Sequence, residues 1–145
     1  MLDGIIKTDL KIIEAESGSV LHALRKTDPG FQEFGEVYFS SVKKDAIKAW
    51  KLHKQMTLNL IVPFGRVLFC FVDNRETSST FDKTCKIILS QEPYFRLTVS
   101  PGVWFGFKGL SDGLNLICNV ADIPHESQEV LRKDIDRINM DWSIE

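Results

Sequence analysis

Short apolar runs separated by turn residues recur along the whole chain, and this spacing limits the possible folds more than any other feature. The runs are rich in Val, Ile and Phe, and turn sequences such as Ser100-Pro101-Gly102 and Ser111-Asp112-Gly113 stand between them. Regular short strands with such turns are typical of an all-β sandwich or barrel rather than of alternating strand–helix units. We expect strands at residues 4–14, 20–24, 35–42, 46–53, 58–62, 66–73, 84–90, 95–99, 103–107 and 114–120.

Only residues 126–138 have much helix-forming composition, with apolar side chains at roughly helical spacing. We expect a short helical or irregular segment there, packed on the outside of the barrel. The 145 residues are enough to bury a real core, and neither a linker nor a repeat divides them. The sequence therefore predicts one all-β domain over residues 1–145.

Charge and apolar content limit the partners and the compartment. Eighteen basic against 20 acidic residues leave a net charge of −2, so the basic excess of a nucleic-acid-binding protein is missing. The most apolar stretch, 58–72, is broken by Pro63 and Gly65 and is too short to cross a membrane. The chain start lacks the features of a signal peptide, and the three cysteines are widely spaced. We predict a cytoplasmic protein with reduced thiols.

Residues 46–54 combine lysines and a histidine with apolar residues in one predicted strand. Strict alternation places Lys51 and His53 on one face, with Ile47 and Ala49, and places Lys48 on the other. An inward ammonium group requires a wet or anionic cavity. The alternative is an edge strand whose lysines prevent aggregation.

Most catalytic signatures are missing from the sequence. The three histidines do not have metal-ligand spacing, and we find no nucleophile motif and no glycine-rich phosphate loop. We therefore expect no metal and no organic cofactor. The functions that remain are acid–base catalysis and simple ligand binding.

Four segments in order give the chain a family resemblance: GEVYFSSV at 35–42, IKAWKLHK at 47–54, FVDNR at 71–75 and SPGVWFGF at 100–107. Together they resemble the dTDP-4-dehydrorhamnose 3,5-epimerase family, most closely its short members among the sugar-epimerase cupins. The resemblance implies a cupin-type jelly-roll barrel and a homodimer. It also implies epimerisation beside the ketone of a nucleotide-linked 4-keto-6-deoxy sugar, without metal or nicotinamide.

The resemblance assigns catalytic candidates by position. Lys51 occupies the place of the family's base histidine, and His53 matches a second histidine of the short relatives. Asp134 corresponds to the acid that orients the base. The family's acid tyrosine falls near residues 121–123, where this chain has no tyrosine.

Five residues are candidates for substrate binding. The resemblance implies that Lys48 keeps the family's substrate-binding cation and that Phe105 replaces a family histidine. Trp104 is a candidate for the cavity wall or for the core, and Arg66 for a phosphate contact or a solvated strand end. Tyr38 is a candidate for the cavity, although alternation allows only Tyr38 or its neighbour to face inward.

Two other functions remain open beside an epimerase. One is a non-catalytic cupin that binds a sugar nucleotide or carbohydrate, since Lys51 and Phe105 depart from the family pattern. The other is a 3,4-ketoisomerase, whose Arg-Gly-x-His-x-His-Lys pattern matches the spacing of 48–54. In each case the partner is a nucleotide-sugar small molecule. Residues 66–73 are apolar on both faces, which favours a homodimer that shares part of a sheet.

Overall fold

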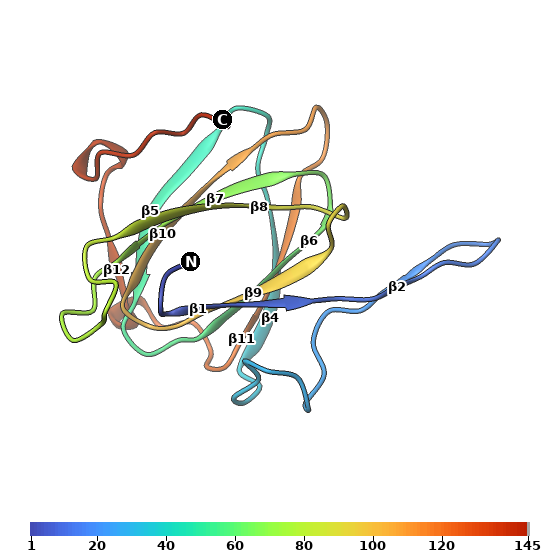
Figure 1. Cartoon of the computed structure of the whole chain (residues 1–145), viewed down its shortest axis with the longest axis horizontal. Coiled ribbons are helices and arrows are strands. Elements are labelled where there is room, and N and C mark those ends of the chain that lie inside the picture. Colours follow the sequence, from blue (N-terminus) through green and yellow to red (C-terminus); the bar gives the residue numbers. More distant parts are fainter. Residues whose placement is uncertain (145) are drawn as a thin grey trace.

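Two antiparallel sheets of five strands face each other in the computed structural model, which describes residues 1–144 (Figure 1). The first sheet has the order β1 (Ile5–Asp9), β9 (Phe95–Val99), β6 (Leu58–Phe64), β11 (Leu116–Ala121) and β4 (Glu36–Ser41). The second has the order β12 (Val130–Arg132), β5 (Ile47–His53), β10 (Val103–Gly109), β7 (Val67–Asp73) and β8 (Thr84–Leu89). This arrangement confirms the predicted all-β sandwich of the cupin type.

The main core lies between the two sheets. Period-two alternation turns Phe69 and Phe71 of β7 and Phe105 of β10 inward, where they meet Leu60 of β6 and Leu97 of β9. All of these side chains are buried. Removing their apolar surface from water is the main force that holds the sheets together.

Strand β7 is also covered on its outer face. Leu68 and Cys70 point away from the core and pack against Ile138, Met140 and Trp142, which follow the last strand. The chain therefore covers both faces of this strand by itself. The apolar run at 66–73 gives no argument for a shared dimer face, and the homodimer stays a prediction without it.

Two predicted elements differ from the structure. The strand expected at 4–14 is divided into β1 and a short β2 (Ile12–Ile13), and β2 pairs with β3 (Val20–Leu21) in a hairpin that projects from the sandwich (Figure 1). Residues 126–138 form two 3-10 turns, η1 (Ser127–Glu129) and η2 (Ile135–Arg137), with β12 between them. Pairing of β12 with β5 prevents a continuous helix. Of the two forms that the sequence predicts for this segment, helical or irregular, the structure has the irregular one. Among residues 1–144 no helix is long and apolar enough to span a bilayer.

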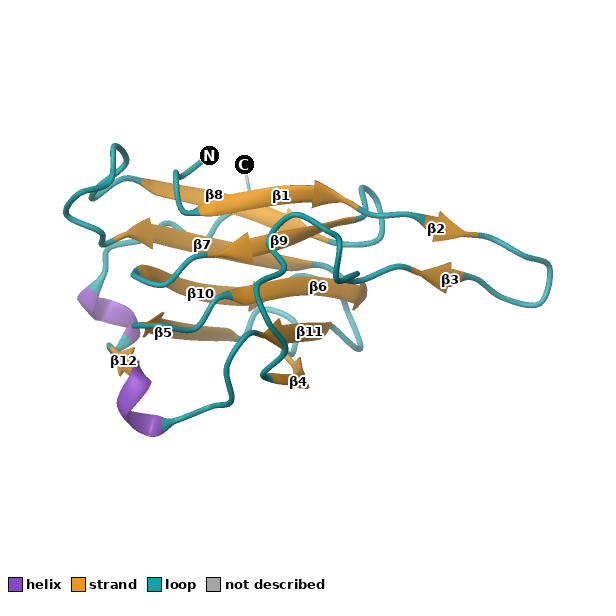
Figure 2. Ribbon diagram, turned by 90° about the horizontal axis from the view of Figure 1, so that it is seen from below, coloured by secondary structure: helices purple, strands orange, loops and turns teal. Residues whose placement is uncertain are grey.

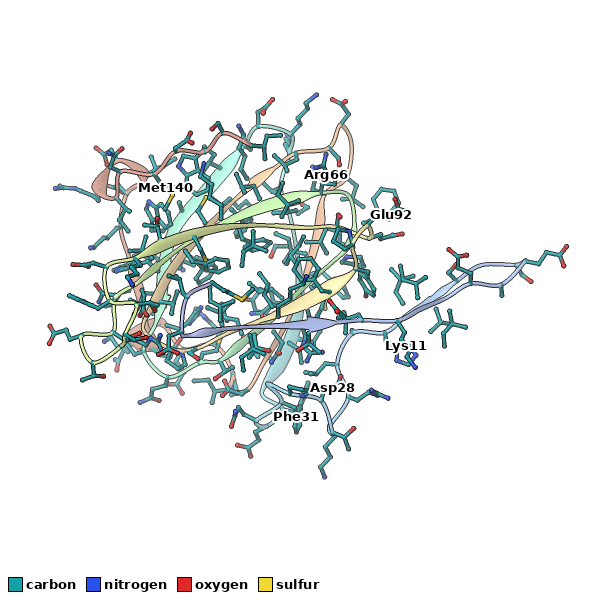
Figure 3. The ribbon with its side chains drawn as sticks, in the orientation of Figure 1. Lys11, Asp28, Phe31, Arg66, Glu92 and Met140 are labelled. Atoms are coloured by element: carbon teal, nitrogen blue, oxygen red, sulfur yellow. The ribbon has the colours of Figure 1, made fainter. Side chains whose placement is uncertain are left out.

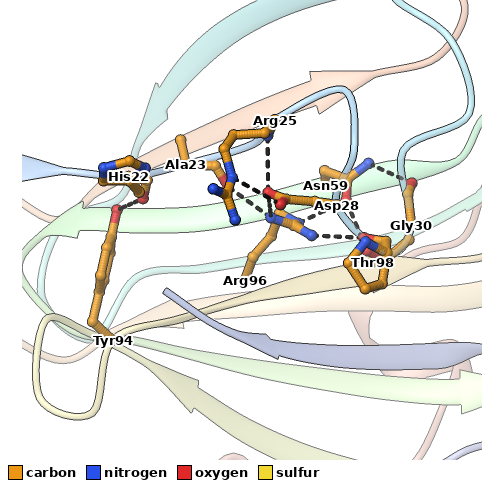
Figure 4. Close-up of polar contacts among 10 residues, drawn as sticks. His22, Ala23, Arg25, Asp28, Gly30, Asn59, Tyr94, Arg96 and Thr98 are labelled. Carbon is orange, nitrogen blue, oxygen red and sulfur yellow. Dashed lines mark hydrogen bonds and ion pairs between the residues drawn. The ribbon is translucent and has the colours of Figure 1, made fainter. Parts of the chain in front are cut away.

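A buried arginine holds the loop after β3 against the outer face of the first sheet (Figure 4). The fully buried Arg96 of β9 donates to Asn59 Oδ1 at 3.0 Å and to Asp28 Oδ2 at 3.3 Å. It also donates to the carbonyls of Ala23 and Pro29, each at 2.7 Å. A buried guanidinium is tolerated because its N–H groups are paired in this way.

Replacing Arg96 with Met should therefore destabilise the fold strongly. The variant removes the cation and leaves buried acceptors without a donor, so we expect the free energy of unfolding to fall by about 3 kcal/mol. Arg25→Met is the matched control, because Arg25 pairs with the same Asp28 from an exposed position and should cost less than about 1 kcal/mol. Urea denaturation measures both. Equal losses in the two variants would contradict this role of Arg96.

Candidate functional site

A β-bulge places two lysines of β5 on the same face. In the ladder between β5 and β10, Lys51 stands opposite Phe105 and Lys48 stands opposite Phe107, with a register shift between the two pairs. Residues directly opposite each other share a face, and both phenylalanines face the core. Lys48 and Lys51 therefore both point inward, whereas strict alternation predicts that they lie on opposite faces of the strand.

The cause of the bulge is the close approach of Gly106 to β5. Ala49 and Trp50 lie together on the outer face, where they oppose Gly106 alone. A Cβ atom at Gly106 would lie only 2.6 Å from the Cβ of Ala49 and 2.9 Å from the Trp142 ring. Only glycine fits there, and the extra residue in β5 turns Lys48 inward.

A cavity of about 900 Å³ opens beside these lysines. Its apolar wall includes Phe105 and Phe107 of β10. Its polar wall comes from β5, from β12 and from the chain around η2: Lys48, Lys51, Arg132, Lys133, Asp134 and Arg137. A volume of this size suits a ligand larger than a single sugar ring.

The cavity is strongly cationic in a chain of net negative charge. Five of its lining side chains are basic and only Asp134 is acidic. Within residues 1–144 none of the five bases forms an ion pair with a carboxylate. Lys48 donates to the Ser41 carbonyl at 2.8 Å, and the Lys133 ammonium lies 4.6 Å from the centre of the Trp104 ring. Unpaired cations around a cavity fit an anionic ligand.

The pKa of Lys51 lies below that of an ordinary lysine. Partial burial is the main cause, because desolvation disfavours the ammonium form. The positive charges of Arg132 and Lys48 act in the same direction. The structure thus places Lys51 in the cavity with a larger neutral fraction than a solvated lysine has.

His53 lies at the end of β5 in a buried pair with Glu129. Its ring stacks on Phe105 with the centroids 5.9 Å apart, and Nδ1 pairs with Glu129 Oε1. Glu129 Oε2 accepts the backbone N–H groups of Gln55 and Met56 at 2.9 and 3.0 Å. Burial acts to raise the pKa of Glu129, but the hydrogen bonds from His53 and the two amides lower it below its usual value. His53 is not among the side chains that line the cavity.

Glu129, not Asp134, is the acid that the fold brings to a β5 base candidate. Asp134 is exposed and contributes to the cavity lining, with no hydrogen bond to His53 or Lys51 in the described chain. Glu129 reaches β5 because β12, which follows it directly, pairs with that strand. The sequence signal for Glu129 is weak, since it lies 76 residues from His53.

The remaining candidates lie in different places. Phe105 lines the cavity, whereas Trp104 belongs to the buried cluster on the outer face of the second sheet. Arg66 and Glu92, both labelled in Figure 3, line another, smaller cavity. Tyr38 faces the interior from β4, opposite Asn119 of β11. Sequence reasoning also missed Arg132, which enters the lining only through the pairing of β12 with β5.

Two comparisons with known proteins indicate the same family. A family model described as dTDP-4-dehydrorhamnose 3,5-epimerase matches residues 24–145. A solved dTDP sugar isomerase from Desulfovibrio desulfuricans G20 is 38% identical, with a TM-score of 0.92 over 97% of this chain and 92% of that one. Comparison with curated proteins gave no match.

Two further solved structures share the fold at lower identity. A dTDP-6-deoxy-D-glucose-3,5-epimerase from Legionella pneumophila, in complex with dTDP-4-keto-L-rhamnose, is 21% identical, with a TM-score of 0.80 over 90% of this chain and 73% of that one. A mutant 3,4-ketoisomerase from Thermoanaerobacterium thermosaccharolyticum, in complex with TDP-4-keto-6-deoxyglucose, is 22% identical. Its TM-score is 0.76 over 92% of this chain and 90% of that one.

The low pKa of Glu129 makes part of the fold's stability dependent on pH. Its carboxylate is favoured in the folded state, so the unfolded chain binds more protons and stability falls as the pH drops through the acidic range. Glu129→Gln should lower the midpoint of thermal unfolding at neutral pH and reduce the further loss on acidification. Glu126→Gln, an exposed change in the same turn, should keep the wild-type response. Identical acid responses of wild type and Glu129→Gln would refute this.

Proposed function

The chain belongs to the dTDP-4-dehydrorhamnose 3,5-epimerase family, and we propose that it acts on a nucleotide-linked 4-keto-6-deoxy sugar by removing a proton next to the ketone. An epimerase or isomerase of nucleotide keto-sugars fits this family. The observation that carries the proposal is the position of Lys51, inward-facing and with a lowered pKa, in a cavity of unpaired cations.

The cations bind the diphosphate of the substrate. Arg132 and Arg137 offer forked donors to phosphate oxygens. Phe105 and Phe107 provide an apolar surface for the flat face of the sugar or the base. The proposed partner is therefore a nucleotide-sugar small molecule.

Lys51 is the proposed base. Its neutral amine takes the proton from the carbon beside the ketone, the C–H bond breaks and its electrons form an enolate. Positive charge from Lys48, which lies near Lys51, stabilises the enolate oxygen. We favour Lys51 over His53 because Lys51 lines the cavity and His53 does not. His53 and Glu129 act by holding the end of β5.

We also propose that residues 1–145 act as one domain in the reducing cytoplasm. The support for the compartment is that Cys70, Cys85 and Cys118 are free thiols. The chemistry proposed above needs neither a metal nor an organic cofactor.

Solvent deuterium exchange tests the proposed function. The protein is incubated in D2O with dTDP-4-keto-6-deoxyglucose, and the recovered sugar is analysed by NMR. Deuterium at a carbon beside the ketone with inversion supports an epimerase, and migration of the ketone identifies a 3,4-ketoisomerase. Binding of the nucleotide sugar without any exchange would contradict the proposal and identify a binding protein.

Lys51→Ala should lose most of this exchange. General-base catalysis contributes about 10²–10⁴-fold, so we expect a rate lower by that factor. The matched control is Lys54→Ala, because Lys54 is an exposed lysine just beyond β5 that does not line the cavity. Exchange at the wild-type rate in Lys51→Ala would rule out Lys51 as the base.

The pH dependence of exchange should follow the charges around Lys51. The neutral amine is the active form, so the rate rises with pH through a pKa below that of an ordinary lysine. Arg132→Gln removes a positive neighbour and should move this acidic limb to higher pH. Arg137→Gln removes a lining cation that does not perturb Lys51, so its limb should stay in place. An unmoved limb in Arg132→Gln would exclude Lys51 as the titrating group.

A further inference from the structure

The inner face of the first sheet carries a second polar cluster, formed by Glu36, Tyr38 and Asn119. Tyr38 of β4 and Asn119 of β11 stand directly opposite each other in their ladder. Asn119 lies between Ile117 and Ala121 along β11, and both of these side chains face the core. Glu36 precedes Tyr38 by two residues and shares its face. The cluster therefore lies on the wall of the sandwich that faces the second sheet.

Tyr38 has a hydroxyl proton that no residue among 1–144 accepts. The Nδ2 group of Asn119 donates to the phenol oxygen at 2.9 Å, so the hydrogen of that hydroxyl is free to donate elsewhere. The chain has only one other tyrosine, Tyr94, which donates to the His22 carbonyl at 2.6 Å on the outer side of the first sheet. Tyr38 is thus the phenol that can give a proton to a molecule between the sheets.

Two buried acceptors next to Tyr38 also have no partner. Asn119 is only 2% exposed, and neither its Oδ1 nor the buried Oε1 of Glu36 accepts a hydrogen bond from any residue in 1–144. Buried polar atoms in folded proteins are nearly always paired. Acceptors left open at an inner wall suit the hydroxyl groups of a bound sugar.

Tyr38 and Lys51 lie on facing sheets, each a few residues from a contact that joins β4 to β5. The Lys48 ammonium contacts the Ser41 carbonyl at 2.8 Å, which joins the start of β5 to the end of β4. Tyr38 is three residues before Ser41, about 10 Å, and the bulge leaves Lys51 only two ladder positions of β10 beyond Lys48, about 7 Å. Figure 2 shows β5 and β11 at the same level of the sandwich. Tyr38 is 40% exposed and Lys51 lines the cavity, so both side chains are open to a ligand.

We propose that Tyr38 is the proton donor for the sugar face opposite Lys51, and that Asn119 is its positioning residue. This rests on the proposed function, because an acid is needed only if a proton is removed and returned. Inversion requires the new proton to reach the carbon from the side opposite the base. Among the described side chains, the wall opposite Lys51 offers a free O–H donor at Tyr38.

The step is balanced without any other reactant. Lys51 takes the proton from the carbon, which leaves an ammonium group and an enolate. The enolate carbon then takes the proton of the Tyr38 hydroxyl, so a C–H bond forms, an O–H bond breaks and a phenolate remains. Tyr38 is 40% exposed, and Lys51 is also accessible to water, so solvent returns both groups to their starting states.

Tyr38→Phe separates removal of the proton from inversion. We expect inversion to fall by about 10²–10⁴-fold, while deuterium still enters the recovered, uninverted sugar because Lys51 can return what it removes. Affinity for dTDP, measured by calorimetry, should stay within about twofold and shows that the variant is folded. Tyr94→Phe is the matched control, since it makes the same chemical change on the outer side of the first sheet and should keep inversion.

The outcomes distinguish the two proposals. Inversion at the wild-type rate in Tyr38→Phe, with exchange intact in wild type, would overturn the role of Tyr38 alone. Absence of exchange in wild type would overturn the proposed function, and the role of Tyr38 with it. Loss of both exchange and inversion in a folded Tyr38→Phe variant would also overturn the assignment, since Tyr38 would then be needed before protonation.

A phenol titration tests the role of Asn119 without turnover. In Tyr94→Phe, Tyr38 is the only tyrosine, so ultraviolet absorbance follows its ionisation alone. Burial raises the pKa of Tyr38, whereas the hydrogen bond from Asn119 lowers it in part. Adding Asn119→Leu should therefore raise this pKa further and slow inversion, with dTDP affinity unchanged. An unmoved pKa, or full inversion in the Asn119→Leu variant, would contradict a positioning role.

Discussion

The contact between Gly106 and the bulge in β5 is the constraint on which the candidate site depends. Because Gly106 lacks a side chain, Ala49, Trp50 and the Trp142 ring can crowd against β10 from outside. The extra residue in β5 then turns both Lys48 and Lys51 toward the interior. Without it, one ammonium group would point into the apolar cluster beneath Trp142, where it would have no partner. Packing on the far side of the sheet thus determines the charge of the cavity.

The two walls of the sandwich differ in chemistry, and the difference matches what a keto-sugar nucleotide presents. The β5 and β12 side is cationic and suits phosphate. The β4 and β11 side offers unpaired acceptors and the hydroxyl groups of Tyr38 and Ser40, which suit a sugar. The carbon that reacts would lie where the two meet. In a site divided in this way, electrostatic complementarity with the diphosphate determines which end of the substrate lies at the cationic wall.

Features that depend on one strand could be predicted from the sequence, and features that depend on pairing could not. The period-two pattern predicted the strands around Lys51. It also predicted that only one of the neighbours Tyr38 and Phe39 can face inward, and in the structure that residue is Tyr38. The inward turn of Lys48 depends on Gly106, a residue 58 positions further along the chain. Likewise Glu129 and Arg132 reach the site only after β12 pairs with β5, and local helical spacing at 126–138 conceals that strand.

The cluster of cations at the cavity also makes the distribution of charge over the molecule uneven. Five basic residues and one acidic residue line the cavity, so 13 basic and 19 acidic residues remain elsewhere in the chain. The rest of the protein is therefore markedly acidic, and a doubly charged anion is repelled from it and drawn toward the mouth of the cavity. Such guidance acts over about a Debye length, roughly 8 Å at physiological ionic strength. Encounter with the ligand should accordingly slow as salt is added, even where the chemistry after binding is unaffected.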